Sequence, residues 1–272
     1  MLQNSFIFLP GVGVHRERLL WRLGIDTWSH LREAAPGTVP GIPQQTHAGH
    51  RKTLLLAEAA YAEGDAAFFG PRLGTREAWR ALGAFMPDAL FLDIETTGLG
   101  RGRDHTTLVG LHSPRHGTKV LVHGDDLTAE AVEEAYARAR VLVTFNGASF
   151  DIPFLRNDLG VAPPPIPHVD LMLALRRVGL AGGLKKVEAQ LGLERPAEVR
   201  GMDGYAAVLL WQRHLKGDAK ALDKLIAYNR EDVRNLAPLS RIAYDRLVLA
   251  TRSPAGATNG RDRPDREGAT DK

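Results

Sequence analysis

The sequence predicts an α/β protein in which helices flank a mixed β-sheet, preceded by a helical N-terminal extension. Short runs rich in β-branched and other apolar residues lie close together at 89–95, 105–112 and 118–124. A helical pattern at 126–139 then precedes another strand-like run at 141–145 and further helical segments. Strands mixed with helices in this order indicate a mixed α/β sheet.

The composition is that of a soluble globular protein. The chain has 272 residues, 44% hydrophobic and 25% charged, enough for one or two domains with a full core. Its formal net charge is only +3, so negatively charged partners are permitted but not required. It contains no cysteine, which excludes disulfides, thiolate metal sites and cysteine nucleophiles, so any metal must be held by oxygen or imidazole.

The sequence gives no sign of a membrane segment or an export signal. Its longest apolar runs are far shorter than the roughly 20 residues that span a bilayer. The N-terminal stretch MLQNSFIFLPGVGV has no basic region before its short apolar patch. We therefore expect no membrane partner and a cytoplasmic location.

Four segments can be separated along the chain. Residues 1–35 combine a Pro-Gly-x-Gly turn with a helical pattern, as in a helical hairpin. Residues 36–86 begin with a linker containing two Pro-Gly pairs and continue with Ala- and Leu-rich helices that break at Gly70-Pro71. Residues 87–250 form the α/β domain. Residues 251–272 have almost nothing apolar, which predicts a disordered tail.

Two carboxylates interrupt the first strand of the α/β domain, in FLDIETTGLG. Residues i and i+2 of a strand point to the same face, so Asp93 and Glu95 project together while Leu92 and Ile94 face the other way. Neighbouring like charges repel unless a positive charge lies between them. Either a cation binds here, or the strand ends at Asp93 and both acids are solvated in a turn.

A further acid follows the strand-like run at 141–145, where Asn146 and Gly147 form a turn before a helix. Ser149 is placed to cap this helix, and Asp151 lies in its first turn. Ligand sites of open α/β sheets lie at the carboxyl ends of strands. Asp151 is therefore a candidate site residue, or an acid that only benefits from the helix dipole.

The motif AYNREDV places Tyr228 and Asp232 four residues apart, on one face of a helix. Alone, this pattern fits an ordinary surface helix. Together with the other three acids, Asp232 completes a set of four carboxylates, which is enough charge for two divalent hard cations. Two such ions can stabilise the attacking and leaving oxygens of a phosphoryl displacement, and a tyrosine one turn from a ligand can orient the attacking water.

These three motifs, Asp-x-Glu-Thr-Thr-Gly-Leu, Asn-x-x-x-Phe-Asp and Tyr-x-x-x-Asp, resemble those of the DEDD superfamily of exonucleases in its tyrosine-type version. The layout also resembles a bacterial family of ribonuclease-H-like predicted exonucleases with an N-terminal segment of the LPGVG…LWRLGIDTW kind. The resemblance covers residues 5 to about 247. It implies a ribonuclease-H-like fold.

The resemblance also implies an activity: 3′→5′ exonuclease action on nucleic acid, with DNA weakly favoured over RNA, using two Mg²⁺ (or Mn²⁺) ions. Its motifs assign metal binding to the four acids, water positioning to Tyr228, contacts with the 3′ nucleotide to the loop after the first strand, and a place beside the scissile bond to one amide. These substrate residues are Thr96, Thr97, Gly98, Leu99 and Asn146. The alternatives are a structure-specific endonuclease on the same fold and a non-catalytic nucleic-acid-binding module.

Three other features have competing interpretations. His168 and Asp170 lie two apart on an expected strand and fit a metal pair or, more commonly, residues that cap or hydrogen-bond a strand end. Lys185 and Lys186 open a helix and fit a solvated face better than a phosphate contact. The segment LPGVGVHRERLLW resembles a helix-hairpin-helix unit that either binds nucleic-acid phosphates or only packs against the nuclease domain.

Overall fold

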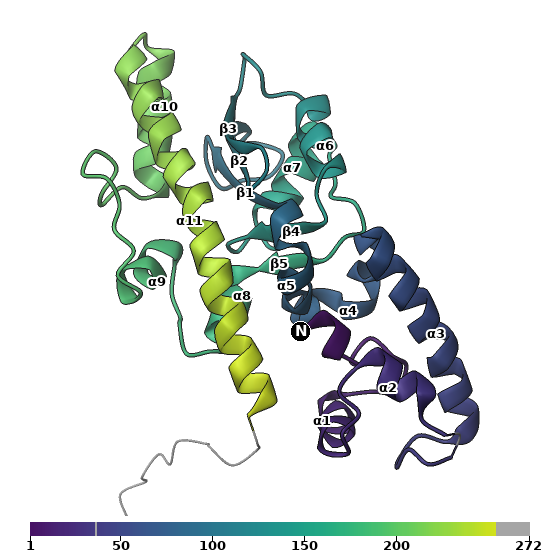
Figure 1. The fold of residues 1–272 in the computed structure, drawn as a ribbon. Helices are drawn as coiled ribbons and strands as arrows, with labels where there is room; N and C mark the ends of the chain where they lie inside the picture. The colour runs from purple at the N-terminus through teal and green to yellow at the C-terminus, as the bar shows by residue number, and fades with distance from the viewer. Residues whose placement is uncertain (36, 254–272) are drawn as a thin grey trace, which may run out of the picture.

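The computed structural model describes residues 1–35 and 37–253 (Figure 1). Most of the predicted tail, residues 254–272, lies outside the described residues. The last helix ends at Arg252, so it extends two residues past the end predicted for the α/β domain.

The N-terminal third of the chain is helical, as the sequence predicts. A 3₁₀ turn replaces the first helix of the expected hairpin, so the LPGVG turn has a full helix only on its C-terminal side. Gly70-Pro71 starts a helix, because proline is tolerated in the first turn. The elements are η1 (Leu2–Asn4), α1 (Val14–Arg22), α2 (Trp28–Glu33), α3 (Gln44–Glu63), η2 (Ala66–Phe68), α4 (Gly70–Glu77), η3 (Ala78–Ala81), α5 (Leu82–Phe85) and η4 (Met86–Asp88).

A five-stranded sheet forms the centre of the molecule and confirms the predicted mixed architecture. Its order is β3-β2-β1-β4-β5; the first three strands pair antiparallel, and β4 and β5 add in parallel. The central strand is the one that carries the acid pair. The strands are β1 (Ala89–Thr96), β2 (Thr106–Ser113), β3 (Gly117–Val122), β4 (Val141–Thr144) and β5 (His168–Asp170).

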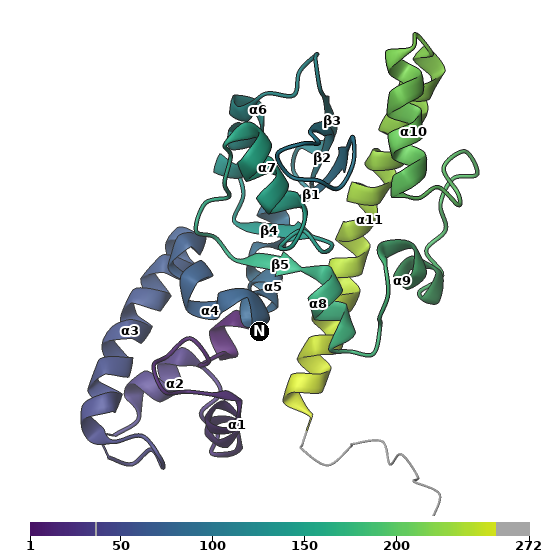
Figure 2. The ribbon, with the colours of Figure 1, turned by 180° about the vertical axis from the view of Figure 1, so that it is seen from behind.

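Helices cover both faces of the sheet (Figures 1 and 2). One face packs against α6 and α7, and the long α11 crosses the other (Figure 1). The helices that follow the first three strands are α6 (Ala129–Ala137), α7 (Asp151–Leu159), α8 (Leu171–Arg176), α9 (Leu184–Gln190), α10 (Gly204–Leu215) and α11 (Ala219–Arg252).

The alternation of β1 determines where its acids point. Leu90, Leu92 and Ile94 pack into the core with α6 and α7. Phe91 packs on the opposite face, in the core that includes α11. Side chains two residues apart share a face, so Asp93 and Glu95 continue the Phe91 side and face α11. The predicted opposition of the acids to Leu92 and Ile94 is therefore correct.

The N-terminal segment shares a core with the sheet. Phe6, Trp28 and Trp79 belong to the same buried cluster as Phe91 and Val143. Two apolar residues of the predicted linker, Val39 and Ile42, are also buried in this cluster. The linker is therefore packed rather than suspended in solvent. Among the described residues, no helix has the length and apolarity needed to cross a bilayer.

Candidate active site

All ten residues that the three motifs assign to the site line one cavity of about 620 Å³ at the carboxyl end of β1. They come from three separate stretches: the end of β1 with the loop after it, the β4–α7 connection, and α11. The ten are Asp93, Glu95, Thr96, Thr97, Gly98, Leu99, Asn146, Asp151, Tyr228 and Asp232. The fold therefore brings together the three motifs, which are far apart in the chain.

Three of the four acids converge most closely. Each of Asp93, Glu95 and Asp232 offers a carboxylate oxygen, and the three oxygens lie within 4.8 Å of one another. Asp151 approaches from the N-terminus of α7, where its Oδ1 accepts a hydrogen bond from the Ile94 backbone N–H at 3.2 Å. This bond ties Asp151 to β1 at Ile94, the residue between Asp93 and Glu95.

The helix α7 begins differently from the prediction. Its N-cap position is Phe150, which makes no side-chain capping bond. Ser149 is therefore not the cap, and that expectation is wrong. Asp151, as the first residue of α7, lies near the free N–H groups of the helix start.

The approach of α11 to the sheet depends on a residue the sequence reasoning missed. Asn229 is completely buried and its Nδ2 donates to Asp93 Oδ2 at 3.0 Å. On β2, Gly110 leaves room for it, because a Cβ at that position would lie 2.3 Å from Asn229 Oδ1. Asn229 thus links the helix that carries Tyr228 and Asp232 to the strand that carries Asp93.

Arg195 is a second missed residue, and it is paired with two acids. Its guanidinium donates two hydrogen bonds of 2.7 Å to the carboxylate of Glu188. A third nitrogen lies 2.5 Å from Asp232 Oδ1. Asn235 donates to Glu188 at 2.9 Å and completes the group. This network fixes Asp232 from the side away from the sheet, and no motif spacing in the sequence signalled it.

Lys185 is at the site, which corrects the interpretation of both lysines as a solvated face. Its ammonium donates a hydrogen bond to the Tyr228 hydroxyl and lies 4.6 Å from the centre of the tyrosine ring. Lys186, the next residue, is exposed. The solvated interpretation therefore holds for Lys186 only.

Burial and mutual repulsion govern the electrostatics of the acids. The pKa values of Asp93 and Glu95 are raised, first by burial and then by the charge of Asp232. Burial raises the pKa of Asp151 to about 7. The pKa of Asp232 is also raised by burial, although Arg195 and Lys185 oppose this rise.

Four carboxyl groups with raised pKa values in one cavity form a site that favours a bound cation. The donor set offers carboxylate oxygens and no sulfur, which suits Mg²⁺ or Mn²⁺. The close approach of three oxygens from different elements fits coordination of a common ion. The residues present therefore fit the divalent metal that the sequence motifs imply.

The mouth of the cavity carries two large exposed apolar residues. Leu99, in the loop after β1, is 84% exposed and Tyr205, at the start of α10, is 71% exposed. The loop itself is held by Asp104, which accepts a hydrogen bond from the Gly100 N–H at 2.7 Å. The ring of Tyr205 offers a surface on which a nucleobase can stack, and Leu99 offers an apolar contact.

The pair His168 and Asp170 supports the β4–α7 loop. Asp170 accepts hydrogen bonds from the backbone N–H groups of Asn146 (2.9 Å), Ala148 (3.1 Å) and Met172 (3.1 Å). His168 bonds the Thr144 hydroxyl at 2.9 Å. The capping interpretation of this pair is correct. Asn146 has a positive φ of 65°, and Asp170 holds it in that conformation.

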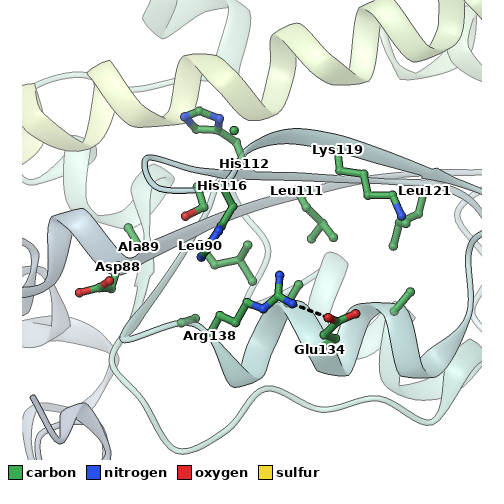
Figure 3. Close-up of a pocket in the computed structure, with 15 residues that line it drawn as sticks. Asp88, Ala89, Leu90, Leu111, His112, His116, Lys119, Leu121, Glu134 and Arg138 are labelled. Carbon is green, nitrogen blue, oxygen red and sulfur yellow. Dashed lines mark hydrogen bonds and ion pairs between the residues drawn. The ribbon is translucent and has the colours of Figure 1, made fainter.

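A second cavity, of about 190 Å³, lies at the other end of β1 (Figure 3). Leu90, Leu111 and Leu121 form its apolar wall, with α6 opposite. The cation of Arg138 is paired there with Glu134. None of the ten site residues lines this cavity, so it is separate from the acidic cluster.

Comparison with known proteins gives one family match and several similar structures. No curated protein matches. Among solved structures, the apo form of a nuclease is 23% identical, with 66% of this chain and 80% of that chain covered and a TM-score of 0.46. Brucella melitensis NrnC bound to pGG is 25% identical, covering 63% of this chain and 78% of that chain, with a TM-score of 0.44.

The family B DNA polymerase from the archaeon Pyrobaculum calidifontis shares the fold at 18% identity, with 60% of this chain and 25% of that chain covered and a TM-score of 0.50. A family model described as RNase H superfamily matches residues 90–244. This stretch holds almost the whole sheet and the part of α11 that carries Tyr228 and Asp232. The match spans more than half of the chain, which therefore belongs to the RNase H superfamily of nucleases.

Proposed function

We propose that the protein is a metal-dependent 3′→5′ exonuclease of the tyrosine-type DEDD kind, which hydrolyses terminal phosphodiester bonds of nucleic acid. The observation that carries this proposal is the convergence of four acids and one tyrosine, from three distant motifs, on a single cavity. Raised carboxyl pKa values support it, since this crowding of acids is unfavourable without a bound cation.

In this proposal the four acids hold two divalent ions, Mg²⁺ or Mn²⁺. When bound, the ions supply the positive charge that stabilises the attacking and the leaving oxygen of an in-line displacement. The protein's own part is to fix the ligands before the substrate arrives. Asn229 holds Asp93, Arg195 holds Asp232, and the Ile94 N–H holds Asp151.

Tyr228 is assigned to orienting the attacking water. Burial, followed by the charges of Asp232 and Glu95, raises its pKa above the ordinary tyrosine value. The phenol therefore stays protonated at neutral pH, and it acts through hydrogen bonds rather than as a general base.

Substrate binding is assigned to the loop and the amide at the cavity wall. Thr96, Thr97, Gly98 and Leu99 would contact the 3′-terminal nucleotide, and Asn146 would lie beside the bond that is cut. All five line the same cavity as the acids. Leu99 is an exposed apolar surface beside the cavity, against which a base can pack.

The test uses 5′-labelled single-stranded DNA and RNA of one sequence, incubated with Mg²⁺, Mn²⁺ or a chelator. We expect a ladder that shortens from the 3′ end only when a metal is present, and its loss in Asp93→Asn. Asp88→Asn is the matched control, because Asp88 pairs with Arg115 at the opposite end of β1. Cleavage of a circular strand would instead show an endonuclease, and full activity of Asp93→Asn would exclude the assigned site.

A further inference from the structure

We propose that the loop between β1 and β2 makes a second contact with the substrate strand, in which Arg101 and Arg103 bind phosphates of the nucleotides that precede the terminal one. The inference rests on the proposed function and deepens it, since it concerns how the same site holds its nucleic acid. Neither arginine belongs to the three motifs. The consequence is a preference for strands longer than a dinucleotide.

The loop between β1 and β2 is closed by its own hydrogen bonds. At its base, the Thr97 N–H donates to the His105 carbonyl at 3.0 Å. Inside it, Asp104 accepts from the Gly100 N–H at 2.7 Å, and the Asp104 N–H donates to the Gly100 carbonyl at 2.7 Å. Gly98 lies so close that a Cβ there would be 2.6 Å from Asp104 Oδ2. The loop therefore presents its exposed residues from a well-defined backbone.

Two guanidinium groups of this loop are exposed to solvent. The side chain of Arg103 is 84% exposed, and a carboxylate oxygen of Asp104 lies 3.7 Å from it. Arg101 is also exposed, and within residues 1–35 and 37–253 it forms no ion pair with a carboxylate. The loop thus carries two cations against one acid, and that acid already accepts the Gly100 N–H.

Arg101 places its charge beside the mouth of the cavity. Its Nη2 donates to the Ser149 backbone carbonyl at 2.8 Å. Phe150, the residue after Ser149, lines the cavity, as does Leu99, two residues before Arg101. Arg101 and Arg103 do not line the cavity themselves. The loop cations therefore lie outside the cavity, next to its rim.

This position determines which part of a substrate the arginines can reach. In the proposed function the terminal nucleotide lies inside the cavity and the scissile phosphate lies at the acids, so the rest of the strand leaves through the mouth. Guanidinium groups beside the mouth then meet the phosphates of the preceding nucleotides. A guanidinium has five N–H donors and binds phosphate oxygens in pairs. The bond from Arg101 to Ser149 uses only one of these donors.

The acids of the site explain why such cations are useful. A strand with many phosphates is repelled by a cavity lined with four carboxylates. Bound metal ions offset this repulsion at the scissile phosphate. Positive charge beside the mouth attracts the part of the strand that the ions do not contact.

The experiment compares two substrate lengths, using the full chain with Arg101→Gln and Arg103→Gln combined. kcat and KM are measured with Mn²⁺ on a dinucleotide without a 5′-phosphate, whose single phosphate is the scissile one, and on a single strand of ~10 nucleotides. We expect KM for the long strand to rise ~10-fold with little change in kcat. Both constants for the dinucleotide should stay the same.

Binding without cleavage gives a second measurement. A fluorescent single strand is titrated with the Asp93→Asn protein, with and without the two arginine substitutions, at several salt concentrations. For single strands, each phosphate contact contributes a slope of about −0.7 to the logarithm of the binding constant against the logarithm of the salt concentration. Loss of both arginines should therefore make the slope shallower by ~1.4.

Two controls separate a phosphate contact from a general effect of charge or folding. Arg115→Gln removes a guanidinium at the opposite end of β1, where Arg115 pairs with Asp88, and should leave both KM values unchanged. If loss of the Arg101 bond to Ser149 disturbs the loop, Arg103→Gln alone tests the proposal, because it leaves that bond in place. It should give about half of the change in slope, ~0.7.

The outcomes distinguish this inference from the proposed function. A wild-type protein that degrades no nucleic acid contradicts the proposed function, and the salt dependence of binding still tests the arginines. An active wild type whose KM for the long strand and salt slope do not change in the double variant overturns their role. An equal rise of KM for the dinucleotide, or an equal effect of Arg115→Gln, also overturns it.

Discussion

At the scale of single residues, Asp93 serves two requirements that conflict. In the proposed function its carboxylate holds a cation, but burial and the charge of Asp232 make that carboxylate unfavourable in the metal-free protein, as its raised pKa indicates. Asp93→Asn removes the charge and keeps the shape. We expect the variant to lose nuclease activity and yet to be more stable than the wild type in chelator, by about 1 kcal/mol or more. Thermal unfolding in EDTA measures this, and a destabilised variant would contradict it.

Asp151 predicts how stability depends on pH. Its pKa in the folded protein is about 7, against 3.8 for an ordinary aspartate, so the folded state binds the proton more tightly. The stability that this gives is complete below pH ~4 and is lost as the pH rises through 7, with an upper limit of ~4 kcal/mol. Asp151→Asn should remove this dependence, making the variant more stable than the wild type at pH 8 in chelator but not at pH 4.

The measurement for Asp151 is urea unfolding of both proteins in EDTA from pH 4 to 8. The difference between the two proteins cancels the titration of the histidines, which is common to both. Saturating Mg²⁺ should remove the fall in wild-type stability between pH 4 and pH 8, since a bound cation favours the ionised carboxylates. A difference that does not change with pH would show that Asp151 has an ordinary pKa.

Arg195 shows how much a buried ion pair depends on both partners. Replacing it with methionine leaves Glu188 and Asp232 buried without their cation, which typically costs 3–5 kcal/mol. Arg213→Met is the control, because Arg213 pairs with Asp218 at the surface, with its side chain 64% exposed, and such pairs contribute ~0–1 kcal/mol. Chemical denaturation of both variants measures the contrast, and equal losses would contradict it.

At the scale of elements, the site depends on how closely α11 approaches the sheet. Gly110 of β2 permits this approach, since any Cβ there would collide with the buried Asn229. Gly110→Ala should therefore push α11 outward, at a cost of ~1–3 kcal/mol. It should also lower activity, because Tyr228 and Asp232 move with the helix. Gly49→Ala in α3 is the control, since nothing lies within 4 Å of its Cβ position; it should leave activity unchanged and stabilise by ~0.5–1 kcal/mol.

The same elements show what the sequence could predict. The strand period placed Asp93 and Glu95 on one face, and the helix period placed Tyr228 and Asp232 on another, because both periods are local properties of the backbone. The packing of α9 and of the Arg195 segment against α11 is not local. Lys185, Arg195 and Asn229 come together only through tertiary contacts between separate elements, so no spacing in the sequence could reveal their roles.

At the scale of the whole molecule, the helical N-terminal segment shares a buried core with the sheet. Arg80 is 1% exposed and pairs with Glu17 at 2.9 Å and Glu77 at 2.7 Å. Glu17 in turn accepts from the backbone N–H groups of the LPGVG hairpin's entry, at Phe6 and Ile7. This network has its charges paired inside the protein.

A connection from the other side joins this network to the α/β domain. Arg177, which follows α8, donates to the backbone carbonyl of Arg76 at 2.6 Å and to Glu77 at 3.3 Å. Trp79 and Phe85 pack in the same core as Phe91 and Val143 of the sheet. The segment therefore packs against β5 and α11 of the α/β domain.

This shared core predicts the behaviour of a truncated protein. A chain that starts at residue 87 would expose the apolar surfaces of β5 and α11 that pack against α4, η3 and α5 in the full chain. We expect this fragment to lack a cooperative thermal transition and to bind a hydrophobic dye such as ANS, as partly folded states with exposed cores do. Circular dichroism, dye fluorescence and size-exclusion chromatography of the fragment and the full chain measure these properties. A monomeric fragment that unfolds cooperatively, near the melting temperature of the full chain, would show instead that the α/β domain folds alone and that the N-terminal segment is dispensable for its core.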